Sequence, residues 1–252
     1  MWIQLNFFSK ALGMNVPVNV LLPSSGVSQR DLPVRPVLWL LHGAYGNQDD
    51  WIRRTAIERY AQEYDLAVVM PAAHLSGYAD MAHGGAFYTY ISKELPKMMR
   101  AFFPLSSKRE ENFIAGLSMG GIGALMIGLA NPDKYAAIGC LSAGMDAPKG
   151  IVADNLITGD GDYRETYLDT RYQAQRIVVS HKTAPRVFVA IGEDDFLLES
   201  ARATRAFFDA IPGNPFRFTY REAPGGHTWA FWDEHIRYFL TWLDLPKVPG
   251  LR

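Results

Sequence analysis

The sequence predicts an α/β protein with a mostly parallel central sheet and helices on both faces. Short apolar segments, typical of strands buried on both sides, alternate along the 252 residues with longer segments of helical periodicity. The alternation begins after two strand-like segments at 2–9 and 15–22 and continues to the end of the chain. No linker-like stretch divides it, so we expect a single domain over residues 1–252.

The first half of the chain predicts two further strands and two helices. An unbroken apolar run at 37–41 follows two prolines, and a second run at 66–70 ends at Pro71. Apolar residues at helical spacing predict a helix over 50–64. A polar loop at 72–86 precedes another predicted helix over 88–103, in which Pro96 marks a kink or the true start.

The second half repeats the alternation around one irregular stretch. The strands are expected at 112–115, 136–141, 187–191 and 216–220, and the helices at 119–130, 197–211 and 228–243. Between them, residues 145–183 are mostly polar, and we interpret them as an insertion with some helix.

Composition excludes several classes of protein. The net charge of −1 provides no basic field for nucleic acid or an anionic membrane. No apolar run is long enough to span a membrane, and the N-terminus does not resemble a signal peptide. The single cysteine, Cys140, fits a reducing compartment, so we expect a cytoplasmic protein. The sequence leaves open whether it forms a homo-oligomer.

A glycine-flanked serine lies between a predicted strand and a predicted helix. The stretch Gly-Leu-Ser-Met-Gly at 116–120 matches the G-x-S-x-G turn that exposes a nucleophilic serine, here Ser118. Side chains two residues before and after the serine would collide in such a turn, which explains Gly116 and Gly120. The alternative is a glycine-rich turn with an idle serine. The flanking strand and helix favour the nucleophile and, with it, the α/β-hydrolase fold.

A serine hydroxyl needs a base to take its proton and an acid to orient that base. In this fold the acid and then the histidine follow the serine, each after a later strand. The carboxylates Glu193, Asp194 and Asp195 follow the strand at 187–191, and His227 follows the strand at 216–220. The order therefore predicts His227 as the base and one of the three carboxylates as the acid.

Two backbone N–H groups are expected to bind the oxyanion that develops during acyl transfer. One belongs to Met119, the residue after the nucleophile. The other belongs to Ala44, in the glycine-containing loop 42–47 that follows the strand at 37–41. His42 starts this loop, and we interpret it as a structural hydrogen-bonding residue because the site already has its base.

Other histidines and aromatic residues are less informative. His74, Asp80 and His83 match no metal-ligand spacing, so we expect no metal. Phe87, Tyr88 and Trp229 are candidates for the substrate pocket. Core packing is an equal alternative for the first two.

Five stretches resemble the esterase D family, and most closely its short-chain tributyrin-type esterases: 40–47, 88–91 with 94–96, 116–121, 192–197 and 225–229. The resemblance implies Ser118, Asp195 and His227 as the catalytic triad, with Ala44 and Met119 as the oxyanion donors. It implies hydrolysis of small-molecule esters with short acyl groups and no cofactor. The polar insertion agrees with short chains, because a long-chain lipase needs an apolar groove.

The resemblance leaves other substrates open. S-formylglutathione hydrolases are a sister group, but they carry a cysteine in the oxyanion strand where this chain has none. Feruloyl or acetyl esters of carbohydrates also occur in the family. An acyltransferase would use the same triad, and a non-enzymatic binding protein would be expected to have a broken triad.

Overall fold

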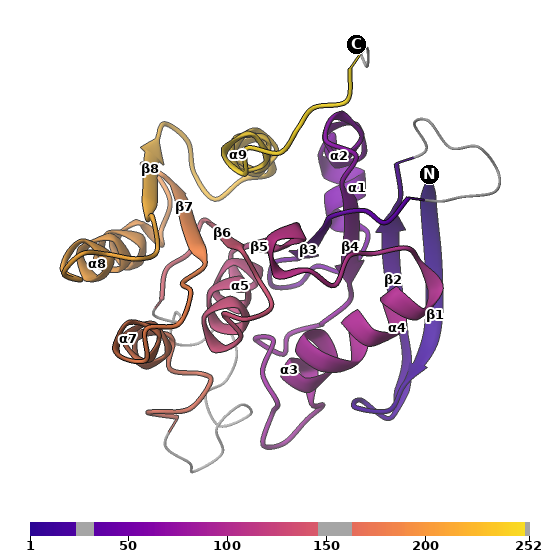
Figure 1. Cartoon of the computed structure of the whole chain (residues 1–252), viewed down its shortest axis with the longest axis horizontal. Coiled ribbons are helices and arrows are strands. Elements are labelled where there is room, and N and C mark those ends of the chain that lie inside the picture. The colour runs from indigo at the N-terminus through magenta and orange to yellow at the C-terminus, as the bar shows by residue number, and fades with distance from the viewer. Residues whose placement is uncertain (24–32, 146–162, 250–252) are drawn as a thin grey trace.

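The computed structural model describes residues 1–23, 33–145 and 163–249, whose strands form one eight-stranded sheet (Figure 1). The strand order is β1-β2-β4-β3-β5-β6-β7-β8. Strands β1, β2 and β4 pair antiparallel, and all pairs from β4 to β8 are parallel. The strands are β1 (Trp2–Ser9), β2 (Met14–Leu21), β3 (Val37–Leu41), β4 (Ala67–Pro71), β5 (Asn112–Leu117), β6 (Ala137–Leu141), β7 (Arg186–Gly192) and β8 (Thr219–Ala223).

Helices cover both faces of this sheet. The helices are α1 (Asp50–Arg54), α2 (Ile57–Glu63), α3 (Phe87–Thr89), the π-helical turn η1 (Tyr90–Glu94), α4 (Leu95–Phe102), the 3-10 turn η2 (Arg109–Glu111), α5 (Met119–Ala130), α7 (Thr170–Val179), α8 (Leu198–Asp209) and α9 (Trp229–Trp242). Helices α1, α2 and α9 lie on one face, and α3, α4, α5, α7 and α8 on the other (Figure 1). The predicted α/β class is therefore confirmed. None of these helices, within the described ranges, is long and apolar enough to cross a membrane.

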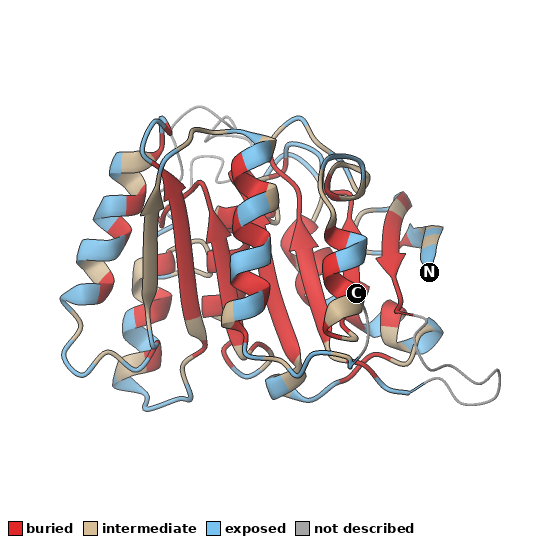
Figure 2. Ribbon diagram, turned by 90° about the horizontal axis from the view of Figure 1, so that it is seen from above, coloured by how far each residue is buried: buried red, intermediate tan, exposed pale blue. Residues whose placement is uncertain are grey.

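The central strands are buried on both sides, as their unbroken apolar sequences predict (Figure 2). Along β3, Val37, Trp39 and Leu41 join the core beneath α5, while Leu38 and Leu40 join the core beneath α2 and α9. One hydrophobic core therefore packs on each face of the sheet, and the two cores together bury its parallel strands.

The hairpin formed by β1 and β2 is tied to the helical layer by a carboxylate. Glu94 accepts hydrogen bonds from the Ser9 hydroxyl at 2.5 Å and from the backbone N–H groups of Lys10 and Ala11 at 2.7 and 3.1 Å. Burial would raise the pKa of Glu94, but these hydrogen bonds outweigh it and lower the pKa. The ionised carboxylate thus closes the turn between the two strands.

The segment 50–64 was predicted as one continuous helix, and this was wrong because it forms two helices, α1 and α2. Thr55 is extended, with φ −139° and ψ 170°. Its hydroxyl donates to the carbonyl of Trp51 and accepts from the N–H of Ile57 at 3.2 Å, so one side chain ends α1 and starts α2. The neighbouring N–H of Ala56 bonds to Asp233 on α9, a contact that local periodicity does not reveal.

The predicted helix over 88–103 is present but contains a wide turn. The π-helical turn η1 ends at Glu94, and Pro96 is the second residue of α4, which continues directly from that turn. Pro96 therefore marks the start of α4 rather than a kink within it.

The strand predicted at 216–220 begins and ends three residues later in the structure, at Thr219 and Ala223. Phe216 and Phe218 instead pack on Phe208 of α8, with ring centroids 5.2 and 4.6 Å apart, and β8 begins only at Thr219. Of the insertion predicted at about 145–183, residues 146–162 lie outside the described residues. Its later part includes helix α7, in agreement with the helix expected there.

Candidate active site

The predicted site residues meet at the carboxyl end of the parallel strands. Ser118 follows β5, Asp195 follows β7 and His227 follows β8. Strands β5, β6, β7 and β8 are neighbours in the sheet, so residues separated by more than a hundred positions come within hydrogen-bond distance of each other. This edge is where ligands bind in open α/β sheets.

Ser118 lies in a strained turn between β5 and α5. Its φ of 52° and ψ of −122° are rare for a residue with a side chain. A Cβ on Gly116 would lie 2.4 Å from the carbonyl oxygen of Gly120, and a Cβ on Gly120 would lie 2.5 Å from that of His42. The steric reason predicted for both glycines is therefore confirmed, and the turn presents the serine hydroxyl above the sheet.

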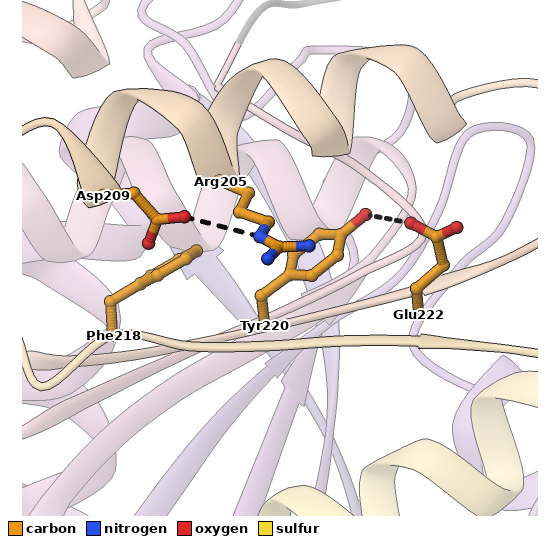
Figure 3. A pocket seen from close by; sticks show the side chains of 5 residues that line it. All are labelled: Arg205, Asp209, Phe218, Tyr220 and Glu222. Carbon is orange, nitrogen blue, oxygen red and sulfur yellow. Dashed lines mark hydrogen bonds and ion pairs between the residues drawn. The ribbon is translucent and has the colours of Figure 1, made fainter.

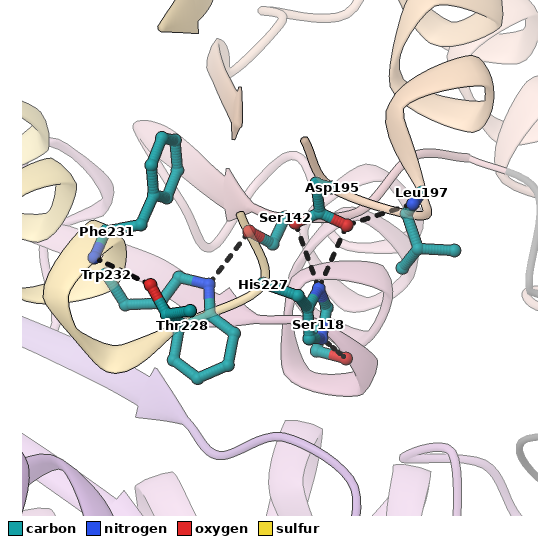
Figure 4. A network of polar contacts seen from close by, with 8 residues as sticks. All are labelled: Ser118, Ser142, Asp195, Leu197, His227, Thr228, Phe231 and Trp232. Atoms are coloured by element: carbon teal, nitrogen blue, oxygen red, sulfur yellow. Dashed lines mark hydrogen bonds and ion pairs between the residues drawn. The ribbon is translucent and has the colours of Figure 1, made fainter. Parts of the chain in front are cut away.

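The three predicted triad side chains form a continuous chain of hydrogen bonds (Figure 4). Nε2 of His227 lies 3.0 Å from the Ser118 hydroxyl. Nδ1 of the same ring lies 3.0 Å from each carboxylate oxygen of Asp195. Because a carboxylate only accepts, Nδ1 carries the ring proton, and the unprotonated Nε2 faces the serine. This is the tautomer in which a histidine can take a serine proton.

Asp195 is the carboxylate that contacts the histidine, whereas Asp194 is exposed. The Asp195 side chain is fully buried and also accepts from the N–H of Leu197 at 2.9 Å. Burial would raise the pKa of Asp195. Hydrogen bonds from His227, Leu197 and the Ser142 hydroxyl outweigh it and lower the pKa. The carboxylate therefore stays ionised at neutral pH.

The loop that carries Ala44 is held by His42. The Nδ1–H of His42 donates to the carbonyl of Gly43 at 2.7 Å, and Nε2 accepts from the N–H of Ala73 at 2.9 Å. Burial lowers the pKa of this ring, which keeps it neutral and able to accept. These contacts confirm His42 as a structural residue that fixes the loop beside the nucleophile.

The predicted oxyanion donors flank Ser118. A Cβ on Gly43 would lie 3.5 Å from the Cβ of Ser118, so the chain entering Ala44 passes directly beside the nucleophile. Met119 is the first residue of α5. Within the described ranges, neither the Ala44 N–H nor the Met119 N–H donates to a protein acceptor. Their oxyanion role stays a prediction.

The three predicted substrate-contact residues lie in packed surroundings. Phe87 is buried against His74. Tyr88 is buried and stacks on Tyr167 at 3.9 Å. Its hydroxyl accepts from Asn131 at 2.9 Å. Both therefore contribute to the core, the alternative that the sequence left open.

Trp229 is only half-buried, and its position two residues after His227 keeps it near the site. Its ring packs edge to face on Trp51 and Trp232, with centroids 5.5 and 5.0 Å apart. The side chain of Arg54 lies over the same ring. A substrate contact for this residue stays a prediction.

Sequence reasoning missed Phe196, the residue after Asp195. Its ring lies 4.5 Å from that of His227 but is 70% exposed. A large apolar side chain exposed beside a reacting histidine is available to a bound molecule. Its exposure could not be read from the sequence, because the apolar Leu197 and Leu198 that follow it predict burial.

Polar side chains at two other places are already paired within the protein. Asp80 accepts from the backbone and hydroxyl of Thr89 at 2.8 and 2.7 Å, and no group of three potential metal ligands occurs within the described residues. An open hollow of about 520 Å³ lies between α8 and β8 (Figure 3). There Arg205 pairs with Asp209, and Tyr220 donates to Glu222, so its polar groups satisfy each other.

The fold and this site define the chain as a serine hydrolase with the α/β-hydrolase fold. The sequence model of the family described as Putative esterase matches residues 9–242, and the chain belongs to that family. It is similar to an acetyl esterase of Caldicellulosiruptor saccharolyticus, at 30% identity over 262 residues that cover 96% of this chain and 97% of that protein.

Two solved structures from Staphylococcus aureus are also similar. The substrate-bound fluorophosphonate-binding serine hydrolase F is 34% identical with a TM-score of 0.87, covering 96% of this chain and 98% of that one. An S-formylglutathione hydrolase is 33% identical with a TM-score of 0.82 and the same coverage. These relationships identify the chain as a carboxylic ester hydrolase of the serine type.

Proposed function

We propose that the protein hydrolyses esters with short acyl chains, through a triad of Ser118, His227 and Asp195. The observation that carries the proposal is the hydrogen-bonded chain from Asp195 through His227 to a serine in a strained turn. The acetyl esterase that resembles this chain over nearly its full length supports a short acyl group. The resemblance of its motifs to tributyrin-type esterases supports the same range.

The proposed reaction has two steps. Nε2 of His227 takes the proton of Ser118 while the serine oxygen attacks the ester carbonyl, and the N–H groups of Ala44 and Met119 bind the oxyanion. His227 then gives the proton to the departing alcohol, which leaves an acyl-serine. Water attacks this acyl group after giving a proton to His227, and the serine regains its proton as the acid departs.

Asp195 acts in both steps without exchanging a proton. Its carboxylate holds the Nδ1–H of His227 and stabilises the imidazolium that forms. Its lowered pKa means that this charge is present throughout the neutral range.

S-formylglutathione hydrolysis is the second candidate, because one similar structure has that activity at 33% identity. The sole cysteine, Cys140, is buried in β6, and burial raises the pKa of its thiol. The sister group resembled by the sequence carries a cysteine in the oxyanion strand, and its absence there in this chain favours oxygen esters. Cys140 also supports the cytoplasm as the expected location.

A series of p-nitrophenyl esters from acetate to palmitate, with S-formylglutathione in parallel, tests the proposal. We expect the highest kcat/KM at acyl chains of about two to four carbons, because each methylene without an apolar wall forfeits up to about 0.8 kcal/mol of burial. A maximum at octanoate or longer would contradict the short-chain proposal. Higher kcat/KM for S-formylglutathione than for every ester would replace it with the thioesterase, and transfer to added alcohols in preference to water would indicate an acyltransferase.

A further inference from the structure

A hydrogen bond between Ser142 and Trp232 lies beside the triad (Figure 4). Ser142 follows β6, the strand between β5 and β7, and its side chain is fully buried. The Nε1–H of Trp232, on α9, donates to the Ser142 hydroxyl at 2.8 Å. Hydrogen bonding from this hydroxyl is also one of the causes of the lowered pKa of Asp195.

The direction of these hydrogen bonds is fixed by chemistry. An indole N–H only donates, so the Ser142 oxygen is the acceptor. The hydroxyl proton of Ser142 is then free to point at a carboxylate that only accepts. Trp232 therefore orients the Ser142 hydroxyl, which leaves its proton available to the neighbouring Asp195 carboxylate.

The backbone at Ser142 indicates that its side chain matters. Its φ of 52° favours glycine, and its N–H is bonded to the carbonyl of Ala190 at 2.8 Å, which fixes the residue in place. A glycine at this position would remove the backbone strain, yet the chain carries a serine. The strained conformation is matched at Ser118, on the neighbouring strand of the same sheet edge.

Trp232 touches the triad a second time. Its ring meets that of His227 edge to face, with centroids 5.0 Å apart and planes at 89°. The indole is almost fully buried, so both contacts are shielded from solvent. One side chain thus packs against the base and hydrogen-bonds the serine beside the acid.

We propose that Ser142 and Trp232 are positioning residues, which hold the Asp195 carboxylate in the orientation that bonds to His227. The proposal rests on the proposed function, because it assigns Asp195 and His227 their roles in the triad. Neither residue belongs to the triad itself, and both act through it.

Removal of the hydroxyl or of the indole N–H tests this proposal. The variants are Ser142→Gly, which suits the positive φ, Ser142→Ala, and Trp232→Phe, which keeps an aromatic ring. Thr219→Ala and Trp242→Phe are matched controls, because Trp242 donates from the same helix to the Thr219 hydroxyl at 3.0 Å without contacting the triad.

We expect kcat for p-nitrophenyl acetate to fall about tenfold in each test variant, the loss of one hydrogen bond to a charged network, with KM unchanged. The controls should stay within about twofold of the wild type. The double variant Ser142→Gly/Trp232→Phe should be no slower than Ser142→Gly alone, since both changes remove the same hydrogen-bonded path. A double variant whose loss of kcat equals the product of the two single losses would contradict this shared path.

A second readout needs no turnover and separates this proposal from the proposed function. We expect carboxyl ¹³C NMR to show the Asp195 titration at higher pH in both Ser142 variants than in the wild type, because a donor to the ionised form has been removed. The signal is assigned by its loss in Asp195→Asn. An unmoved titration overturns the positioning role even if the enzyme hydrolyses esters, and a moved titration supports it even if it does not.

Discussion

Replacement of Asp195 by asparagine should place the histidine in the wrong tautomer. Both carboxylate oxygens lie 3.0 Å from Nδ1 of His227, and one of them, Oδ1, also accepts from the N–H of Leu197. In Asp195→Asn the amide oxygen is needed at the Oδ1 position to satisfy Leu197. The NH₂ group then occupies the Oδ2 position, where it donates to Nδ1 and forces the ring proton onto Nε2.

With its proton on Nε2, His227 cannot accept the proton of Ser118, and the negative charge that stabilises the imidazolium is lost. Comparable substitutions in serine proteases lower kcat by about 10⁴, which corresponds to about 5.5 kcal/mol of transition-state stabilisation. Asp194→Asn is the matched control. Asp194 is exposed, so its variant should keep kcat within about threefold of the wild type.

The assay is kcat for p-nitrophenyl acetate near neutral pH, with thermal unfolding to show that both variants are folded. If Asp194→Asn lost more activity than Asp195→Asn, the acid of the triad would be assigned to the wrong residue. An Asp195→Asn variant with kcat within tenfold of the wild type would refute the tautomer argument.

Three further results are expected. Gly120→Ala should lower the free energy of unfolding, measured by urea denaturation, by about 3 kcal/mol or more. The added Cβ would lie 2.5 Å from the carbonyl oxygen of His42, and a loss under about 1 kcal/mol would contradict this steric argument. Glu94→Gln should destabilise by about 1–3 kcal/mol at pH 7. Since the folded-state pKa of Glu94 is lowered, this difference should be full above the unfolded value of 4.5 and vanish as pH falls through the folded value, and a pH-independent difference would refute it. Phe196→Ala should lower the kcat/KM ratio of phenyl acetate to methyl acetate about fivefold, because we expect the exposed ring beside His227 to contact the leaving alcohol. An unchanged ratio would exclude that contact.

Much of the fold could be predicted from sequence because the central strands are apolar throughout. Strands buried on both faces, such as β3 and β5, produce unbroken apolar runs that fall within two residues of their observed bounds. The same rule misplaced β8, which lies at the edge of the sheet. Its residues are only half-buried, whereas the apolar Phe216 and Phe218 before it pack on α8.

The break at Thr55 was missed for a related reason. It depends on hydrogen bonds made by one side chain and on Asp233, 177 residues away from Ala56. Periodicity over a local window contains neither signal.

The triad of the candidate site could be predicted from the sequence, whereas the residues beside it could not. Ser118 and His227 follow from a glycine-rich turn and from chain order, and the choice of Asp195 came from the resemblance to a family. Ser142 was missed because a serine after a strand is common in any sequence. Only the position of β6 between β5 and β7 brings it to Asp195, and strand order is a property of the folded sheet.

The central claim is that Ser118 is the nucleophile of this esterase, and kcat/KM of Ser118→Ala for p-nitrophenyl acetate tests it most directly. The Ser118 hydroxyl lies 3.0 Å from the base, and its removal eliminates the covalent route. We predict a folded variant whose kcat/KM is lower than that of the wild type by about three orders of magnitude or more. A cleanly purified Ser118→Ala protein with turnover close to that of the wild type would contradict the account.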